Sequence, residues 1–478
     1  MARVAPLVLA ALLSVGTIVV PSPAGSVVRA ASLGRAASPV VGAASPVVRA
    51  ASPVGRAASP VSAGDIVPGS VGRSSLRLDA TYDAYLRLAW ATRAISVSSV
   101  ATITNTSGGP IDRVELNTIA PRLGRMRLRP VTVDGVVVSA TVSDQTIVVP
   151  LGGILPAGGT TTIRVGYGAT LRRDLVGSDW LFTKANGIVD LYRWLPWVSR
   201  RIAFDRPNHG DPFETPTSAS VRVRIVTDRK VVLATTGDRV SVSADGRTQV
   251  FTADHVRDFT VTAATDYRTG SRVVNGTTVR VWYRPGAPGA AMLDAAADAF
   301  AALSARLGPY PHRVFKVVQS AGSYGMESPG LIWIPTGVAT SNLRYLAAHE
   351  TAYQWFYGIV GNDQSSQPFT DEAAADFAAR SVLGLRRASR CAMARLDRPI
   401  YAYSARCYYE TIYIQGGNLL DEARRRMGSA AFWPALRGYI TANRDGIASS
   451  RTLLDALDAA TPLNLGATLF GPRFPSLY

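Results

Sequence analysis

Between about residue 73 and residue 286 the chain alternates hydrophobic and polar positions in short runs. Turn pairs such as Asp-Gly, Gly-Gly and Asn-Gly separate the runs, and this pattern is typical of antiparallel strands. Clear examples are 94–104, 131–138, 161–167, 219–226 and 277–283. About 200 residues of this kind predict one large β-sandwich or saddle-like sheet assembly. We interpret the aromatic-rich piece at 191–198 as packing, either in the core or against the next domain.

From residue 287 onward the hydrophobic spacing becomes helical. The segment 290–307 predicts an amphipathic helix, because Gly308 and Pro309 follow it as a stop signal. Strands are predicted at 314–319 and 331–335. Further helices are predicted at 342–358, 371–385, 408–427, 429–444 and 450–459. The fold class is therefore multidomain α+β, with an N-terminal antiparallel β-domain at 73–286 and a domain of small sheet plus helices at 287–478.

The first 72 residues carry neither pattern. Arg3, the apolar run 6–20 and the small residues that follow have the organisation of a signal peptide at 1–25. An uncleaved anchor is the alternative, but the run is short for a membrane span. Over 26–72 the sequence Ala-Ala-Ser-Pro-Val recurs every seven residues, and its prolines exclude a coiled coil. We predict a disordered linker and a secreted or cell-envelope-associated protein without a lipid-anchoring cysteine.

The chain is strongly basic, with a formal net charge of +17, and nearly all of its cations are arginines. A surface of this kind is expected to attract an anionic cell-envelope polymer. The arginines are scattered and no nucleic-acid-binding motif accompanies them, so we expect no specific nucleic-acid partner.

Cys391 and Cys407 are the only two cysteines. In an exported chain they would meet an oxidising compartment, which favours a disulfide between them. Two free thiols are the alternative. Two cysteines without a Cys-x-x-Cys pair disfavour a thiolate zinc site.

Candidate metal ligands occur in the helical half of the chain. His349 and Glu350 open a motif of the form His-Glu-x-x-His, in which two histidines one helical turn apart hold zinc and the glutamate activates its water. Here Tyr353 stands at the second histidine position. Glu372 follows nineteen residues later as a candidate ligand, and Asp376, one turn further, is a candidate to orient His349.

Two other side chains suit peptide chemistry. The phenol of Tyr413 can donate to the oxyanion of a tetrahedral intermediate. The carboxylate of Glu327 can accept a charge-assisted hydrogen bond from the α-amino group of a substrate. Together with a zinc ion, these residues predict a peptide as substrate or ligand.

These residues together resemble the aminopeptidase N family, the exopeptidase branch of the gluzincin zinc metallopeptidases, over about residues 75–462. Tyr-Gly-Met-Glu-Ser-Pro-Gly at 324–330 looks like the family's Gly-x-Met-Glu-Asn strand. The stretch 349–358 looks like its helix motif, and 367–372 is similar to its Trp-x-x-Glu-Gly stretch. The resemblance implies a thermolysin-like domain at 287–478 that binds one zinc ion and removes N-terminal residues from peptides.

The same resemblance assigns roles to individual residues. Gly325, Met326 and Glu327 would bind substrate, whereas Glu350 and Tyr413 would be catalytic. His349 and Glu372 would bind the metal, with Tyr353 in place of the family's histidine.

The departures from the family pattern bear on the metal. Phe369 replaces a tryptophan and Ala373 a glycine around the third-ligand position, and Tyr353 replaces a histidine. A phenol has a pKa of about 10 and must lose its proton to bind zinc, so we expect weak zinc binding or none. Each residue also has a structural interpretation, such as packing for Tyr353 and Tyr413.

Two functions therefore remain open. The first is an exported zinc metallopeptidase of the aminopeptidase N type with an impaired zinc site. The second is a catalytically inactive pseudopeptidase that acts as a peptide- or cell-envelope-binding module.

Overall fold

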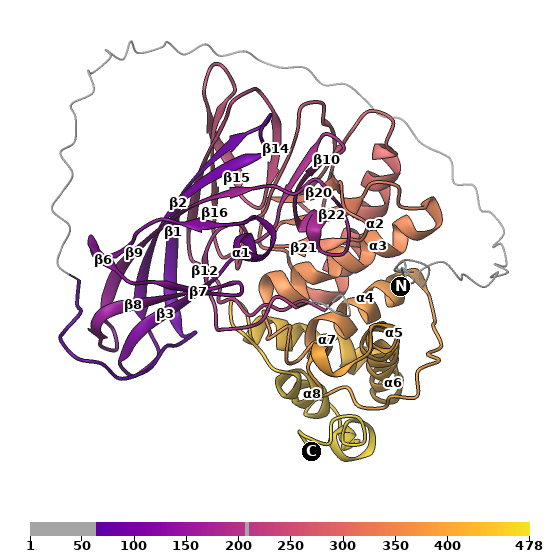
Figure 1. The fold of residues 1–478 in the computed structure, drawn as a ribbon. Helices are drawn as coiled ribbons and strands as arrows, with labels where there is room; N and C mark the ends of the chain where they lie inside the picture. The colour runs from indigo at the N-terminus through magenta and orange to yellow at the C-terminus, as the bar shows by residue number, and fades with distance from the viewer. Residues whose placement is uncertain (1–63, 206–209) are drawn as a thin grey trace, which may run out of the picture. The chain divides into compact units, whose positions relative to one another are not determined.

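The computed structural model describes residues 64–205 and 210–478. The predicted signal peptide at 1–25 and the predicted linker up to residue 63 lie outside the described residues. Within the described chain, strands dominate the first part and helices the second, as the colours of Figure 1 show.

The largest sheet is built around the hairpin of β1 (Leu78–Ala89) and β2 (Ala94–Asn105). Every second residue of β1 from Leu78 to Leu88 is buried, so the alternating sequence places one face of the strand on the core. The nine strands follow the order β15-β16-β13-β1-β2-β9-β5-β6, with β4 beside β9. All neighbours are antiparallel except β1 and β13, which are parallel. The other strands are β4 (Arg127–Leu128), β5 (Val131–Val133), β6 (Val136–Val138), β9 (Thr160–Thr170), β13 (Val221–Thr227), β15 (Asp238–Val242) and β16 (Thr248–Ala253).

Two four-stranded sheets complete the β-rich part, with the orders β12-β3-β8-β7 and β10-β11-β17-β14. Their buried side chains join those of the large sheet in one hydrophobic cluster, which also includes Met326 and Trp333 from the second part of the chain. The two parts therefore share a core. The elements are β3 (Ile111–Asn117), α1 (Ala120–Leu123), β7 (Thr141–Ser143), β8 (Thr146–Leu155), a 3-10 turn (Asp179–Leu181), β10 (Phe182–Ala185), β11 (Ile188–Leu191), β12 (Trp197–Val198), β14 (Val232–Thr235) and β17 (Val261–Ala264).

A five-stranded sheet begins the second part, in the order β18-β19-β20-β22-β21. Its strands are β18 (Arg268–Val274), β19 (Thr277–Tyr283), β20 (Val314–Ser320), β21 (Met326–Ser328) and β22 (Leu331–Pro335). The predicted boundary at 286 differs from the point where the sheets change, between Ala264 and Arg268. Strand β19 alternates like the preceding strands, but it pairs in parallel with β20. Alternation identifies a strand and not the sheet it joins.

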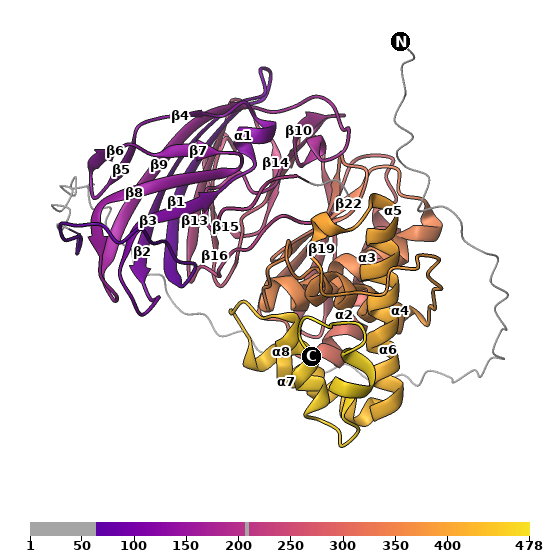
Figure 2. The same ribbon diagram turned by 60° about the horizontal axis from the view of Figure 1, so that its bottom comes forward.

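Helices make up most of the remaining chain, and Figure 2 brings them to the front. They are α2 (Gly289–Leu307), α3 (Thr340–Tyr353), α4 (Ala374–Leu383), α5 (Ala405–Tyr408), α6 (Gly416–Met427), α7 (Ser429–Ala442) and α8 (Ser450–Asp458), with a 3-10 turn at Ile400–Ala402. Across the described ranges, no helix is both long enough and apolar enough to cross a membrane.

Three of the predicted helices contain a π-helical turn, which inserts an extra residue per turn and is frequent at functional sites. These turns are Gln354–Ile359 after α3, Phe369–Ala373 before α4 and Tyr409–Gln415 before α6; a fourth, Gly466–Phe470, lies near the C-terminus. The first three adjoin the predicted site residues.

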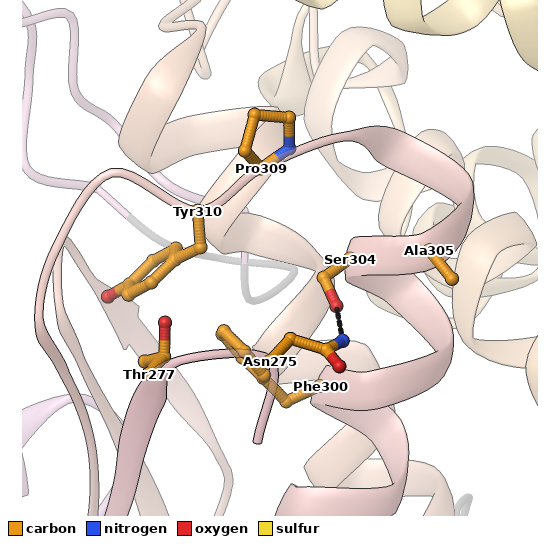
Figure 3. Close-up of a pocket in the computed structure, with 7 residues that line it drawn as sticks. All are labelled: Asn275, Thr277, Phe300, Ser304, Ala305, Pro309 and Tyr310. Carbon is orange, nitrogen blue, oxygen red and sulfur yellow. Dashed lines mark hydrogen bonds between the residues drawn. The ribbon is translucent and has the colours of Figure 1, made fainter. Parts of the chain in front are cut away.

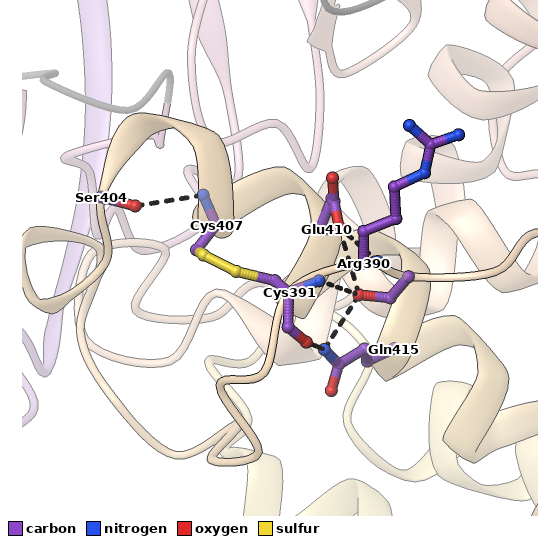
Figure 4. The surroundings of a disulfide bond; sticks show 7 residues. Arg390, Cys391, Ser404, Cys407, Glu410 and Gln415 are labelled. Atoms are coloured by element: carbon purple, nitrogen blue, oxygen red, sulfur yellow. Dashed lines mark hydrogen bonds between the residues drawn. A yellow bond between two sulfur atoms is a disulfide. The ribbon is translucent and has the colours of Figure 1, made fainter. Parts of the chain in front are cut away.

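Cys391 and Cys407 form a disulfide, with their Cα atoms 5.7 Å apart (Figure 4). It closes the segment between α4 and α5, most of which has no regular secondary structure. The side-chain amide of Gln415 donates a 2.8 Å hydrogen bond to the carbonyl oxygen of Cys391, and Glu410 accepts one from the backbone N–H of Arg390. The structure therefore contains the disulfide that the sequence favoured over two free thiols.

Candidate functional site

Helix α3 carries the first group of predicted site residues. His349 and Tyr353 are four residues apart and share one helix face, whereas Glu350 points from the neighbouring position. All three side chains are buried, with relative exposures of 6% for His349, 4% for Glu350 and 3% for Tyr353.

Glu372 lies in the π-helical turn that precedes α4. Its Oε2 accepts a hydrogen bond from the hydroxyl of Tyr353, and the same oxygen lies 3.9 Å from Nε2 of His349. The structure therefore brings together the three residues that the sequence predicted as metal ligands.

The donor set does not form a three-ligand zinc site. Catalytic zinc normally has three histidine, carboxylate or thiolate ligands and an open position for water. No group of three such residues that could hold a metal occurs within residues 64–205 and 210–478. Tyr353 contributes a phenol whose hydroxyl already bonds Glu372. Among the described residues, Nδ1 of His349 has no hydrogen-bond partner. In a metal-binding histidine, the ring nitrogen that does not bind the metal usually donates a hydrogen bond.

Asp376 contacts other groups than the one predicted. Its Oδ1 accepts a hydrogen bond from the hydroxyl of Tyr345, and its Oδ2 lies 2.6 Å from Nε of Arg380. Arg380 sits four residues further along the same helix, where a carboxylate and a guanidinium meet readily. The predicted contact between Asp376 and His349 is therefore not formed.

Aromatic rings enclose the imidazole of His349. Tyr345 and Tyr413 stack on it, with ring centroids 5.8 Å and 5.4 Å away, and Tyr353 meets it edge-on at 5.1 Å. Burial, with smaller contributions from the positive charges of Arg387 and Arg380, lowers the pKa of His349 to about 3. The imidazole is thus neutral at neutral pH.

Strand β21 and the glycine before it form the other wall of the site. The carboxylate of Glu350 lies directly over Gly325, where a Cβ would overlap its Oε1, Cδ and Cγ atoms. Glycine at this position therefore makes room for Glu350. Met326 is buried in the shared core, and Glu327 is 3% exposed.

The site is acidic and tightly enclosed. Burial raises the pKa of Glu327 well above its ordinary value, and the charges of Asp211, Glu350 and Glu372 raise it further. Burial, then Asp211, raises the pKa of Glu350 in the same way. Like carboxylates out of water cannot all ionise, so the cluster favours protons or a bound cation.

Tyr413 also lies in this group. Burial raises the pKa of its phenol well above the ordinary value, and the charge of Glu372 and a hydrogen bond to that carboxylate add to the effect. The phenol thus stays protonated and can act as a hydrogen-bond donor.

Sequence reasoning missed four residues that surround this cluster: Arg193, Asp211, Asp258 and Gln364. Gln364 Nε2 donates a 3.0 Å hydrogen bond to Oε1 of Glu327, and Arg193 bonds Gln364 in turn. Arg193 belongs to the aromatic-rich piece at 191–198 that we interpreted as packing. It was the one charged residue among apolar neighbours, a signal that could have found it.

A separate pocket of about 220 Å³ contains none of the predicted site residues. It lies where the turn between β18 and β19 meets the end of α2 (Figure 3). It is lined by Asn275, Thr277, Phe300, Ser304, Ala305, Pro309 and Tyr310. Within this lining, Asn275 donates a 3.0 Å hydrogen bond to Ser304.

The fold is similar to that of the two-domain M1 zinc metallopeptidases. No protein-family model matches the chain, and no curated protein matches it in sequence. Its structural neighbours are M1 zinc metallopeptidases, the aminopeptidase N family, so the predicted fold class and the predicted resemblance are confirmed.

Three of these neighbours come from Deinococcus radiodurans. A mutant M1 zinc metallopeptidase is 20% identical, with a TM-score of 0.66 over 86% of this chain and 96% of its own. A second structure of that organism's M1 zinc metallopeptidase has a TM-score of 0.64 at 20% identity, covering 84% and 95%. The mutant bound to a Tyr-Ser-Ala substrate has a TM-score of 0.65 at 20% identity, covering 86% and 96%. At this identity the likeness establishes the fold.

Proposed function

We propose that this chain is a divergent member of the M1 metallopeptidase family that binds peptides by their free N-terminus, with zinc-dependent hydrolysis impaired at Tyr353. The observation that carries the proposal is the arrangement of Glu327, Glu350 and Glu372 around one buried site beside His349. A structural neighbour crystallised with the peptide Tyr-Ser-Ala supports a peptide as ligand.

The acidic cluster suits the ammonium group of a peptide. A cation entering it would relieve the repulsion among the carboxylates and favour their ionised forms. Glu327 would accept the charge-assisted hydrogen bond, which is stronger than one between neutral groups. An acetylated N-terminus carries no charge and would be bound less well.

The metal part of the proposal rests on the phenol of Tyr353. Zinc could bind His349 and Glu372 only after the bond from Tyr353 to Glu372 opened and the phenol gave up its proton or swung aside. We therefore derive no catalytic step through zinc. Glu350 and Tyr413 also lie at the site. In a variant that binds zinc, we propose Glu350 as the base and Tyr413 as the hydrogen-bond donor to the oxyanion.

Calorimetric titration of the full chain with Tyr-Ser-Ala and with its N-acetyl form tests the binding proposal. We expect the free peptide to bind at least about tenfold more tightly, since a charged hydrogen bond contributes 1.5–3 kcal/mol. Glu327→Gln should abolish most of that difference. Equal affinity of the wild type for the two peptides would refute N-terminal recognition.

A catalytically inactive pseudopeptidase is the second candidate, and the hydrogen bond from Tyr353 to Glu372 favours it. It predicts that peptide binds without cleavage at any zinc concentration. Chromatography of the peptide after long incubation with added zinc separates the two candidates, because slow cleavage that is lost on Glu350→Gln identifies a peptidase.

We further propose that the chain is exported and that its linker retains it on anionic cell-envelope polymer. The signal-like segment at 1–25, the repeats at 26–72 and the net charge of +17 support this. Cell fractionation tests export. Salt-sensitive retention on an anionic polymer column, compared between the full chain and a form lacking 26–72, tests the linker. Retention that does not change on this deletion would contradict the role of the linker.

A further inference from the structure

Arg193 places a permanent positive charge in the interior, between the β-rich part of the chain and the site. It follows β11, is 5% exposed, and has a backbone φ of +42° that only a well-supported side chain sustains. Its guanidinium lies 3.9 Å from the ring centroid of Phe213 and donates a 3.3 Å hydrogen bond to Thr215. Its Nη2 donates to residues of the second part of the chain.

One set of contacts runs from Arg193 to Glu327. Nη2 of Arg193 lies 3.4 Å from Oε1 of Gln364 as a hydrogen-bond donor, and Nε2 of Gln364 donates to Oε1 of Glu327 at 3.0 Å. Gln364 is 2% exposed. A guanidinium has only donors, so Arg193 requires an acceptor from Gln364. The amide of Gln364 therefore has one favourable orientation, with its oxygen towards Arg193 and its N–H towards Glu327.

A second set of contacts reaches the same strand. Nη2 of Arg193 donates at 2.7 Å to the hydroxyl of Tyr357, which donates at 2.5 Å to Oδ2 of Asp258. Oδ1 of Asp258 accepts a hydrogen bond from Ser328. Ser328 and Glu327 are consecutive residues of β21. Both sets of contacts thus start at one guanidinium and end on one strand.

We propose that Gln364 is a positioning residue for Glu327, and that Arg193 acts through it by fixing the orientation of its amide. This inference rests on the proposed function, in which Glu327 receives the N-terminus of a peptide. The amide N–H holds Oε1 of Glu327 in place, so the carboxylate presents one defined direction to an incoming ammonium group. Without the amide, the carboxylate would have to be ordered at the moment of binding, which weakens affinity.

The test compares affinities of the full chain for Tyr-Ser-Ala and N-acetyl-Tyr-Ser-Ala. Gln364→Met keeps the length of the side chain and removes both hydrogen bonds. Gln364→Glu keeps the acceptor for Arg193 but turns an oxygen towards Glu327. We expect Gln364→Met to weaken binding of the free peptide about tenfold and Gln364→Glu to weaken it more, with little change for the acetylated peptide.

Gln249→Met is the matched control. Gln249 is 3% exposed, accepts a hydrogen bond from Arg239 and donates to backbone carbonyls, but lies on β16, away from the site. It should leave the ratio of the two affinities unchanged. Thermal melts confirm that each variant is folded. If a Gln364 variant does not fold, Gln364→Asn replaces it, because asparagine keeps the amide on a side chain that is one methylene shorter.

The outcomes separate the two proposals. If the wild type distinguishes the two peptides and folded Gln364 variants distinguish them equally well, the positioning role is overturned and the proposed function stands. If the wild type does not distinguish them, the proposed function is overturned, and the positioning role with it. A fall in affinity for both peptides alike would mean a general structural role and would also overturn the inference.

Discussion

The hydroxyl of Tyr353 donates a hydrogen bond to Oε2 of Glu372, the oxygen that also lies nearest to Nε2 of His349. A phenol thus occupies the carboxylate that the sequence predicted as a zinc ligand. The bond pairs two buried polar groups with each other, which offsets part of the cost of burying them.

Restoring the histidine should restore the metal. We expect Tyr353→His to retain about one zinc per chain after dialysis against a mild chelator, because it completes a set of three ligands. We expect the wild type to lose it. Metal content by mass spectrometry is the measurement.

Tyr353→Phe is the control for this experiment, because it removes the phenol without adding a ligand. It should bind no zinc. If the wild type keeps zinc as well as Tyr353→His does, the phenol is itself a ligand and the impairment we propose does not exist.

The close approach of Glu350 to Gly325 gives a second prediction. A methyl group at position 325 would overlap the carboxylate, which is 4% exposed and has little room to move. We expect Gly325→Ala to lower the free energy of unfolding by about 1–3 kcal/mol, the usual effect of overpacking, and to weaken peptide binding. Chemical denaturation and titration measure the two effects.

Gly438→Ala is the matching control. A Cβ at that exposed position of α7 meets nothing within 4 Å. Alanine should stabilise the helix by up to about 1 kcal/mol and leave peptide binding unchanged. If the two variants changed the free energy of unfolding and the peptide affinity equally, the small size of Gly325 would not be needed to make room for Glu350.

A third prediction concerns pH. Asp190 of β11 is fully buried, accepts a 2.8 Å hydrogen bond from the backbone N–H of Ala321, and has its pKa raised by burial to about 8. Between the unfolded value, about 4, and the folded value the native state holds a proton that the unfolded state has released. Stability due to this group is therefore present at low pH and is lost as pH rises towards 8.

We expect Asp190→Asn to remove this loss, because an amide does not ionise. Relative to the wild type, the variant should gain stability as pH rises from about 4 to 8, by up to about 1.4 kcal/mol per pH unit. Melting temperatures at several pH values measure it. Asp79→Asn, on the exposed face of β1, controls for the lost charge. If the difference in melting temperature between Asp190→Asn and the wild type did not change with pH, the prediction would be contradicted.

A fourth prediction concerns the disulfide. Its cysteines are sixteen residues apart, and closing a loop of that length stabilises a protein by about 3 kcal/mol in the chain-entropy model. We expect a reductant to lower the melting temperature of the wild type and to leave a Cys391→Ser/Cys407→Ser variant unchanged. A wild type that melts at one temperature with and without reductant would show that the bond adds no stability.

Much of the fold followed from local pattern. The strand predicted at 331–335 is β22, and the helix predicted at 290–307 is α2 less one residue. Both succeed because periodicity and stop signals act over a few residues. The spacing of His349, Tyr353 and Glu372 also found a real cluster, because two of the three share a helix face.

What the sequence did not supply is the identity of distant neighbours. Nothing local pairs Arg193 with Gln364, since only the packing of the two parts of the chain brings them together. For Asp376, a local signal was available. Arg380 stands four residues later on the same helix, and that spacing favours the ion pair over a contact with His349.

The parallel pairing of β1 with β13 also governs how the chain reaches this structure. The register runs from Tyr82 opposite Val221 to Leu88 opposite Thr227, so the centre of the largest sheet joins segments far apart in sequence. The hairpin of β1 and β2 can form early, but the other edge of β1 stays open until β13 arrives. Sheets completed by such distant contacts fold slowly, and an open edge invites mispairing. The chain's slowest step in folding should therefore be the closure of this one pair.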